Sequence, residues 1–304
     1  MRPDFARGAI DLHIHSAPDV IDRLADSIDI ATAAADAGMR AIVLKDHAYP
    51  SFLKAVLTDR VVPGVRVFGG ITLNATVGGL SLRTVKGAIA GGARVVMFPT
   101  CDTAMTVKRQ ESGNLPPSPM SAHGFGLPFV ALRTVDDHGK VTPEVDDILR
   151  FIADHPDVIV SNGHLPEDEA VPLFERAAEL GIRKLVIEHP NSHPAFFSPE
   201  SLRTLVDLGA TMNLSPNAYN PVMLKRKFSE VVEFIATYGA DHCALITDGG
   251  QPFNPMPPIT LNTFCAMLNK EGVSTDDIHL MTQVVPAKLL DIDLSAESDG
   301  DTDQ

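Results

Sequence analysis

Short apolar segments recur along the chain, and an amphipathic segment follows most of them. Eight such apolar segments recur, and several of them are nearly continuous in Val, Ile and Leu, which is typical of parallel strands buried on both faces. The predicted strands are residues 10–15, 41–47, 67–73, 94–99, 158–164, 184–189, 210–215 and 243–248. The predicted helices are residues 28–37, 51–57, 81–90, 144–153, 167–180, 199–208, 222–238 and 260–268.

Glycines stand where three of these helices must end. Gly38, Gly181 and Gly209 each follow a predicted helix and precede a strand, which suits a left-handed C-terminal cap. Eight strand–helix units are the number that closes a ring of parallel strands. The sequence therefore predicts an α/β fold, a (β/α)8 TIM-type barrel over residues 1–290, rather than an open sheet.

Two parts of the chain fall outside this alternation. Residues 100–143 form a long excursion after the fourth strand, with a Gly-, Pro- and Ser-rich part at 113–126 and a predicted hairpin at 129–141. The loops that follow barrel strands build the active site, so the excursion is either a surface insertion or a lid over the barrel mouth. Residues 291–304 carry six acidic residues and no Lys or Arg, and we expect them to form an acidic, disordered tail.

Histidines and one aspartate fall at the carboxyl ends of four predicted strands. His13 and His15 lie one residue apart on the first strand, so their side chains point to the same side. His164 and His189 end the fifth and sixth strands, and Asp248 ends the eighth. Strand carboxyl ends meet at one mouth of a barrel, and imidazoles with a carboxylate are suitable ligands for a divalent metal. We therefore predict a metal site formed by these five residues.

The second strand ends in Lys45-Asp46-His47, which adds two catalytic candidates. Lys45 and His47 would stabilise the oxyanion that forms during hydrolysis, or would be ordinary loop residues. Lys45 is also a candidate for binding an anionic group of a substrate. Arg133, on the predicted lid, is a second candidate for that group.

This pattern resembles the amidohydrolase superfamily, whose members are metal-dependent hydrolases on a (β/α)8 barrel, and the resemblance covers nearly the whole chain. The residues that match the family's ligands, strand by strand, are His13, His15, His164, His189 and Asp248. Residues 285–290 also resemble the Asn-Pro-Ala-Lys-Leu-Leu segment with which many members end, although Val285 replaces the Asn. Gly-His-Leu at 163–165 and Thr-Asp-Gly-Gly-Gln at 247–251 are similar to an uncharacterised branch of that superfamily.

The end of the fourth strand departs from that family. Members with two metals usually bridge them there through a carboxylated Lys or a Glu, whereas this chain has Met97-Phe98-Pro99-Thr100. The site would then hold one ion, or two ions bridged by Lys45 or Asp46. Lys45-Asp46-His47 also resembles the Thr-Asp-His of the PHP phosphoesterases, but Gly70-Ile71-Thr72 replaces their strand 3 glutamate.

The resemblance implies a metal-dependent hydrolase that acts on a small amide, lactam, lactone or ester. Its cofactor would be Zn²⁺, with Mn²⁺ as the alternative, and one or two ions would bind. The metal would lower the pKa of its bound water, and Asp248 would accept the proton as the water attacks. Three alternatives stay open: a one-metal decarboxylase or hydratase of the same superfamily, a PHP-like phosphoesterase, and a barrel that binds metal or ligand without turnover.

Composition and charge narrow the choice of partners. The formal net charge of −14 disfavours nucleic acid and anionic membranes, so the expected partner is a small-molecule substrate. Three cysteines without close spacing, together with the lack of an apolar leader or span, predict a cytoplasmic protein. Barrels of this size commonly self-associate, and a homo-oligomer is compatible with the sequence.

Overall fold

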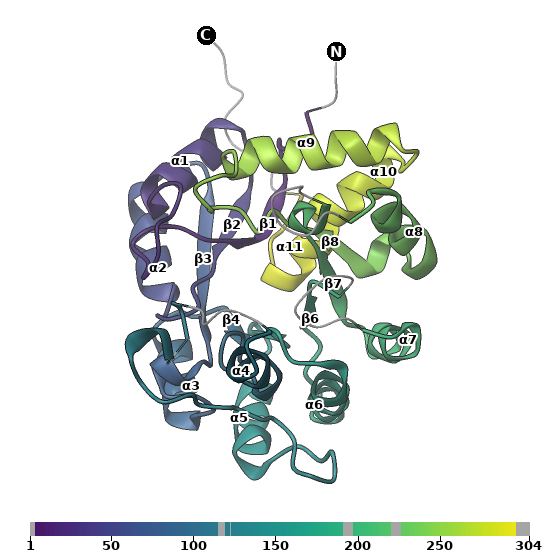
Figure 1. Ribbon diagram of the computed structural model, residues 1–304. Helices are drawn as coiled ribbons and strands as arrows, with labels where there is room; N and C mark the ends of the chain where they lie inside the picture. The colour runs from purple at the N-terminus through teal and green to yellow at the C-terminus, as the bar shows by residue number, and fades with distance from the viewer. Residues whose placement is uncertain (1–3, 115–118, 122, 191–196, 220–225, 296–304) are drawn as a thin grey trace.

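Eight parallel strands form one sheet that curls into a barrel, with its strands in chain order (Figure 1). The computed structural model describes residues 4–114, 119–121, 123–190, 197–219 and 226–295. The strands are β1 (Ile10–Ile14), β2 (Ala41–Leu44), β3 (Arg66–Thr72), β4 (Val95–Met97), β5 (Ile159–Ser161), β6 (Leu185–Glu188), β7 (Thr211–Leu214) and β8 (Cys243–Leu245). The predicted (β/α)8 barrel is confirmed, because each strand pairs in parallel with the next.

The helices surround the strands in the order of the chain (Figure 1). They are α1 (Ser27–Asp36), α2 (Phe52–Val61), α3 (Leu82–Ala90), α4 (Ala104–Glu111), α5 (Pro143–Ala153), α6 (Glu167–Glu179), α7 (Pro199–Asp207), α8 (Ser229–Tyr238), α9 (Pro257–Lys270), α10 (Thr275–His279) and α11 (Val285–Leu290). Gly38, Gly181 and Gly209 have φ values of 72°, 86° and 84°, as a left-handed cap requires. None of the helices in the described part of the chain is long and apolar enough to cross a membrane.

The seam between β1 and β8 is closed by the backbone and by one buried carboxylate. His15 N donates to Gly249 O at 2.9 Å, and Thr247 N donates to Asp11 Oδ1 at 3.2 Å. Asp11 is fully buried and also accepts from the Thr247 hydroxyl and from His13 N. Burial raises the pKa of Asp11 to about 6, against the effect of these hydrogen bonds.

Apolar side chains fill the barrel and separate it from the helices. Ile10, Leu12, Val43 and Val186 belong to a cluster that also includes residues of α11. A second cluster lies between the strands and the outer helices and includes Ile14. This core leaves the carboxyl ends of the strands available for polar residues.

The excursion after β4 differs from the expectation. It contains a helix, α4, which begins at an N-cap formed by the Thr103 hydroxyl, where no helix was predicted. The expected hairpin is reduced to one antiparallel bridge between Val135 and Val141. Part of the proposed lid (115–118 and 122), the predicted start of the helix at 222–225, and residues 296–304 of the acidic tail lie outside the described residues.

Candidate metal centre

Five imidazoles from four strands form a closed ring at the carboxyl end of the barrel. They are His13, His15, His47, His164 and His189. Taken in that order, neighbouring ring centroids lie 5.2, 5.2, 5.8 and 5.9 Å apart, and 5.4 Å separates His189 from His13. The structure therefore brings together all four histidines of the predicted metal site, and His47 joins them by stacking on His15.

A shift in the register of β1 directs its two histidines into the site. The pairing of β1 with β2 shifts between Asp11 and Ile14, as a bulge does. Ile10 and Leu12 belong to the cluster inside the barrel, whereas Ile14 belongs to the cluster under the helices. Bulges are frequent beside active sites because they redirect side chains. Here the bulge allows His13 and His15 to face the mouth above an apolar interior.

Asp248 lies against three of the imidazoles. Its Oδ1 is 3.2 Å from His15 Nε2 and 3.5 Å from His13 Nε2, and its Oδ2 is 3.9 Å from His189 Nε2. Asn217 Nδ2 donates to Asp248 Oδ2 at 3.0 Å and fixes the carboxylate from the other side. Burial alone would raise the pKa of Asp248, but the hydrogen bond from His15 holds it well below its usual range.

The backbone is strained at two of the predicted ligands. His189 and Asp248 have φ values of 50° and 46°, in the left-handed region that side chains other than glycine rarely adopt. In the described chain one further residue besides glycine shares this conformation, Asp291, which caps α11. Such strain persists where the surrounding structure enforces it and is concentrated at functional sites.

Glu188 holds His13 in an orientation suited to metal binding. Its Oε2 lies 3.0 Å from His13 Nδ1, so a proton on Nδ1 leaves the lone pair of Nε2 directed into the site. That Nε2 is buried and, among the described residues, makes no hydrogen bond. A buried, unpaired imidazole nitrogen beside a carboxylate fits a metal ion, as does the mixed nitrogen and oxygen donor set.

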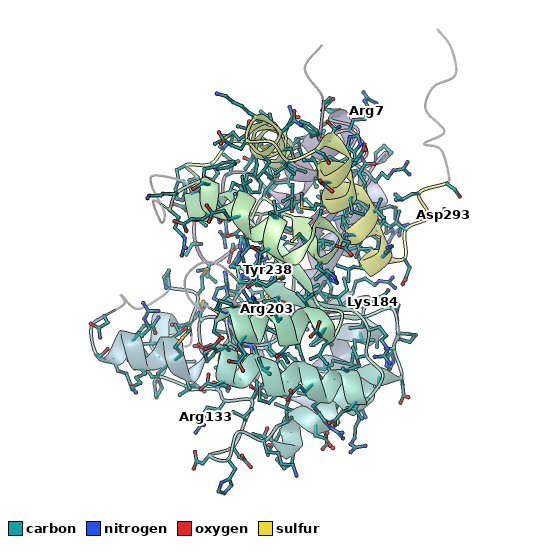
Figure 2. All side chains as sticks on the ribbon, turned by 90° about the vertical axis from the view of Figure 1, so that its right-hand side faces the viewer. Arg7, Arg133, Lys184, Arg203, Tyr238 and Asp293 are labelled. Carbon is teal, nitrogen blue, oxygen red and sulfur yellow. The ribbon has the colours of Figure 1, made fainter. Side chains whose placement is uncertain are left out.

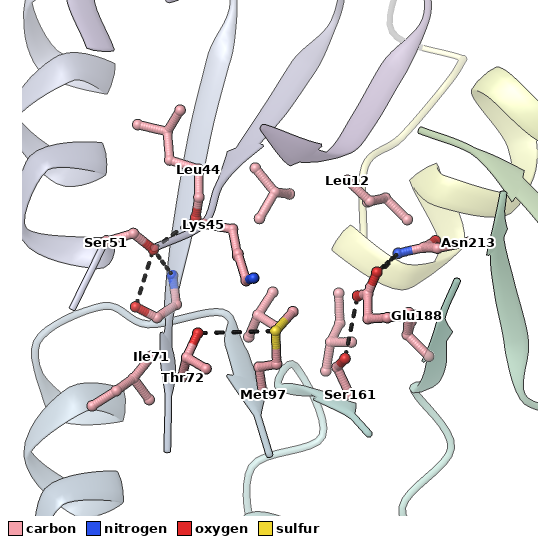
Figure 3. Close-up of a pocket in the computed structure, with 15 residues that line it drawn as sticks. Leu12, Leu44, Lys45, Ser51, Ile71, Thr72, Met97, Ser161, Glu188 and Asn213 are labelled. Atoms are coloured by element: carbon pink, nitrogen blue, oxygen red, sulfur yellow. Dashed lines mark hydrogen bonds between the residues drawn. The ribbon is translucent and has the colours of Figure 1, made fainter. Parts of the chain in front are cut away.

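Two strand neighbours fix Glu188 in turn. Asn213 Nδ2 donates to both of its carboxylate oxygens, at 3.1 and 3.2 Å, and the Ser161 hydroxyl donates to Oε1 at 3.2 Å (Figure 3). Burial would raise the pKa of Glu188, but His13 and these hydrogen bonds lower it to about 2. Glu188 is therefore a permanent carboxylate beneath the ring of imidazoles.

Lys45 projects into the barrel from the end of β2, on the opposite side of the pocket from Glu188 (Figure 3). Its Nζ lies 3.1 and 3.0 Å from the two ring nitrogens of His47, whose Nδ1 is also 2.8 Å from the Thr100 hydroxyl. Burial lowers the pKa of Lys45 to about 8. The neighbouring Asp46 accepts from Lys54 Nζ at its Oδ1 at 2.8 Å, and one of its carboxylate oxygens lies within 4.8 Å of a ring nitrogen of His15. Both residues considered for a bridge therefore lie at the site, Lys45 against His47 and Asp46 near His15.

Burial keeps the imidazoles in their neutral, ligating form. It lowers the pKa of His15, His47, His164 and His189, and nearby positive charges add to the effect at the first three. A neutral imidazole offers a lone pair at pH 7, which a metal ion requires.

Residues that the sequence did not single out complete the surroundings. Glu188, Asn213 and Asn217 position the ligands, and Arg23 Nη2 lies 3.2 Å from His15 Nδ1. Glu188 could have been noticed because it precedes His189 on the same strand end. Arg23 belongs to a loop without periodicity, which gave no signal.

Arg133, the second candidate for substrate binding, lies on the outside of the protein (Figure 2). Its side chain is 48% exposed, and Nη1 donates to Asp137 Oδ1 at 2.8 Å. No contact among the described residues connects it with the imidazoles.

Comparisons with known proteins agree with this fold. An amidohydrolase from Pseudomonas aeruginosa superposes with a TM-score of 0.61 at 11% identity, covering 94% of this chain and 97% of the other. The phosphotriesterase homology protein from Escherichia coli, solved with phosphate in its active site, gives 0.58 at 13% identity, with 92% and 98% covered. A lactonase from Listeria monocytogenes gives 0.55 at 14% identity, with 94% and 95% covered.

Sequence comparison adds one match. The profile described as "Family of unknown function (DUF6282)" matches residues 8–213. A search of curated proteins finds no match. The fold is thus shared with barrels that carry several hydrolytic activities, and the chemistry of this chain has to be argued from its own site.

Proposed function

Because the chain belongs to the DUF6282 family, whose function is unknown, we propose an activity from its site: metal-dependent hydrolysis of a small amide, lactam, lactone or ester. The observation that carries the proposal is the closed ring of five imidazoles with Asp248 against three of them. The amidohydrolase and lactonase among the structural neighbours support the same reaction class.

The ligand set suits Zn²⁺ or Mn²⁺. His13, His15 and Asp248 would hold one ion, since their ligand atoms lie within 4.8 Å of one another. His164 and His189, with His47 beside them, would hold a second ion or complete the first site. A bound divalent metal would polarise the scissile carbonyl and lower the pKa of water.

The chain's own residues would move the proton and stabilise charge. Asp248, whose lowered pKa keeps it ionised at pH 7, would accept a proton from the attacking water and deliver it to the leaving group. Lys45, on the barrel side of the ring, would donate a hydrogen bond to the developing oxyanion. Asn217 would hold the Asp248 carboxylate in place through both of its contacts, to Oδ2 and to the backbone carbonyl.

His47 supports a second candidate, phosphoester hydrolysis. It stacks on His15 and touches Lys45, so the strand 2 residues belong to the site rather than to an ordinary loop. The phosphotriesterase homology protein, which shares the fold, was solved with phosphate in its active site.

The test is a panel assay on protein freed of metal and then reloaded. Aryl esters, lactones, cyclic amides and an aryl phosphate are offered to the Zn²⁺-loaded, Mn²⁺-loaded and chelator-treated protein, with metal content measured in parallel. We expect hydrolysis that requires metal and falls about 10²- to 10⁴-fold in Asp248→Asn. Asp137→Asn, at an 89% exposed side chain, is the matched control. Turnover without metal, or full activity in Asp248→Asn, would overturn the proposal.

A further inference from the structure

Arg23 is a buried guanidinium beside the metal centre. Its side chain is 2% exposed, and it is held by Asp19, whose side chain is fully buried. Nε and Nη2 both contact Asp19 Oδ2 at 2.7 Å, and Nη2 also lies 3.2 Å from His15 Nδ1. Nη1 has no acceptor among the described residues. The side chain as a whole is almost completely buried, so the two N–H groups of Nη1 are held at the site and are available to a ligand.

The loop that carries Arg23 is fixed against the barrel mouth. Leu24 N donates to the backbone oxygen of Gly250, in the loop after β8, at 2.8 Å. Within the Arg23 loop, Ala17 N donates to Ala25 O at 2.9 Å. Lys54 Nζ donates to Ser16 O at 2.7 Å. The guanidinium is therefore presented by a pinned segment, as a site that recognises a fixed geometry requires.

Lys45 lies on the other side of the same pair of imidazoles. His15 and His47 stack with their planes 17° apart, Arg23 contacts the first, and Lys45 contacts the second. Two cationic groups thus flank one stacked pair. His15 Nε2 faces Asp248 while its Nδ1 faces Arg23, so one imidazole separates the guanidinium from the carboxylate that would act as base.

Charge at the centre also favours an anionic ligand. Asp19 neutralises Arg23, and Asp46 neutralises Lys54. The charges that remain at the centre are one positive charge on Lys45 and two negative charges, on Asp248 and Glu188. This set carries one negative charge, and a divalent ion makes it net positive. A neutral substrate would leave that positive charge uncompensated in a buried site.

We propose that the Nη1 end of Arg23 forms an oxyanion subsite, so that the substrate carries a carboxylate or phosphate group a few bonds from the scissile bond. The proposal rests on the function proposed above and specifies its substrate class. Arg23 is suited to this role because a guanidinium donates charge-assisted hydrogen bonds to oxyanions, and Nη1 is the nitrogen that Asp19 and His15 leave available.

The test measures binding of probe anions and does not depend on turnover. Malonate, acetate, inorganic phosphate and uncharged malonamide are titrated calorimetrically into the Zn²⁺-loaded protein. We expect malonate or phosphate to bind roughly tenfold or more tightly than acetate, and malonamide not to bind. Preference for malonate identifies a carboxylate, and preference for phosphate identifies a phosphoryl group.

Substitutions test whether Arg23 causes the preference for malonate or phosphate over acetate and malonamide. Arg23→Gln should remove it and Arg23→Lys should restore part of it. Asp19→Asn/Arg23→Gln removes both buried charges together and keeps the test valid if Arg23→Gln fails to fold. Arg150→Gln is the matched control, because Arg150 forms the same i,i+4 pair with Asp146 on the surface. Metal content should stay at the wild-type level in every variant.

Three results would overturn the subsite: equal binding of malonate and malonamide, an unchanged preference in the double variant, or loss of metal in Arg23→Lys. The two proposals fail separately. If the substrate panel gives no turnover but malonate binds through Arg23, the hydrolase proposal falls and the subsite stands. If only uncharged substrates are hydrolysed, the subsite falls and the hydrolase proposal stands.

Discussion

His13 Nδ1 lies 3.0 Å from Glu188 Oε2, and this contact fixes which nitrogen of His13 faces the metal centre. In Glu188→Gln the amide can present either a donor or an acceptor, so the orientation of His13 is lost. We expect metal affinity to fall about 10- to 100-fold, measured by competition with a chelator.

The matched control for that substitution is Glu169→Gln. Glu169 is also buried, and it accepts from Thr134 N at 2.6 Å, away from the imidazoles. The Glu169→Gln variant should therefore lose stability but keep its metal affinity. Wild-type affinity in Glu188→Gln would show that Glu188 does not orient His13.

Lys45→Met tests the role of the buried amine. Since Lys45 would act on the oxyanion, we expect kcat/KM to fall about 100-fold while the metal content stays the same. Lys184→Met, at a surface ion pair with Asp291, should have little effect. Loss of a metal equivalent in Lys45→Met would instead assign the amine to a bridge between two ions.

Gly250→Ala tests the seam beside His15. Gly250 has φ of 101°, and a Cβ there would lie 1.9 Å from His15 O. Gly181 has φ of 86° with open space around it, so Gly181→Ala measures the backbone cost alone, about 1 kcal/mol. We expect Gly250→Ala to lose at least about 2 kcal/mol more in denaturant unfolding, and also to lose metal. Equal losses of unfolding free energy in Gly250→Ala and Gly181→Ala would mean that the backbone at the β1–β8 seam moves to accommodate the added Cβ.

Acid should weaken the fold of the metal-free protein. His15, His47, His164 and His189 have pKa values lowered by burial, so the unfolded chain takes up more protons than the folded chain below pH 6.5. Stability therefore falls as pH drops from about 7 to 5.

The raised pKa values of Asp11 and Asp46, both about 6, oppose this trend because the folded chain holds those protons. Four imidazoles against two carboxyls leave a net loss of stability over that range for the metal-free protein, measured by urea unfolding. Metal should stay bound below pH 6.5, the usual titration range of histidine. Stability that does not change between pH 7 and 5, or metal release centred at pH 6.5, would contradict the buried, neutral state of the four imidazoles.

The barrel was predictable because two signals agreed. Apolar segments marked buried parallel strands, and glycines such as Gly181 marked the ends of helices. The grouping of the candidate ligands followed from strand ends, since the topology brings those ends to one mouth. His47 joined the ring although sequence alone left it equally compatible with an ordinary loop residue.

Other features could not be read from the sequence for physical reasons. Glu188 and His189 are adjacent, and strand periodicity would place them on opposite faces. The positive φ of His189 breaks that alternation, so both side chains reach the site. Helix α4 was missed because its mean polarity is high and glycine and proline follow it. Arg23 depends on a loop whose path is fixed by contacts across the seam, which no local pattern encodes.

The carboxylate of Asp11 joins positions 236 residues apart when it accepts the Thr247 hydroxyl. The candidate ligands on the two sides of that junction, His13 and Asp248, are therefore synthesised far apart in time. A nascent chain carries the first pair of imidazoles long before the opposing aspartate leaves the ribosome. Capture of an ion by the complete candidate ligand set thus has to wait until Asp248 has been translated.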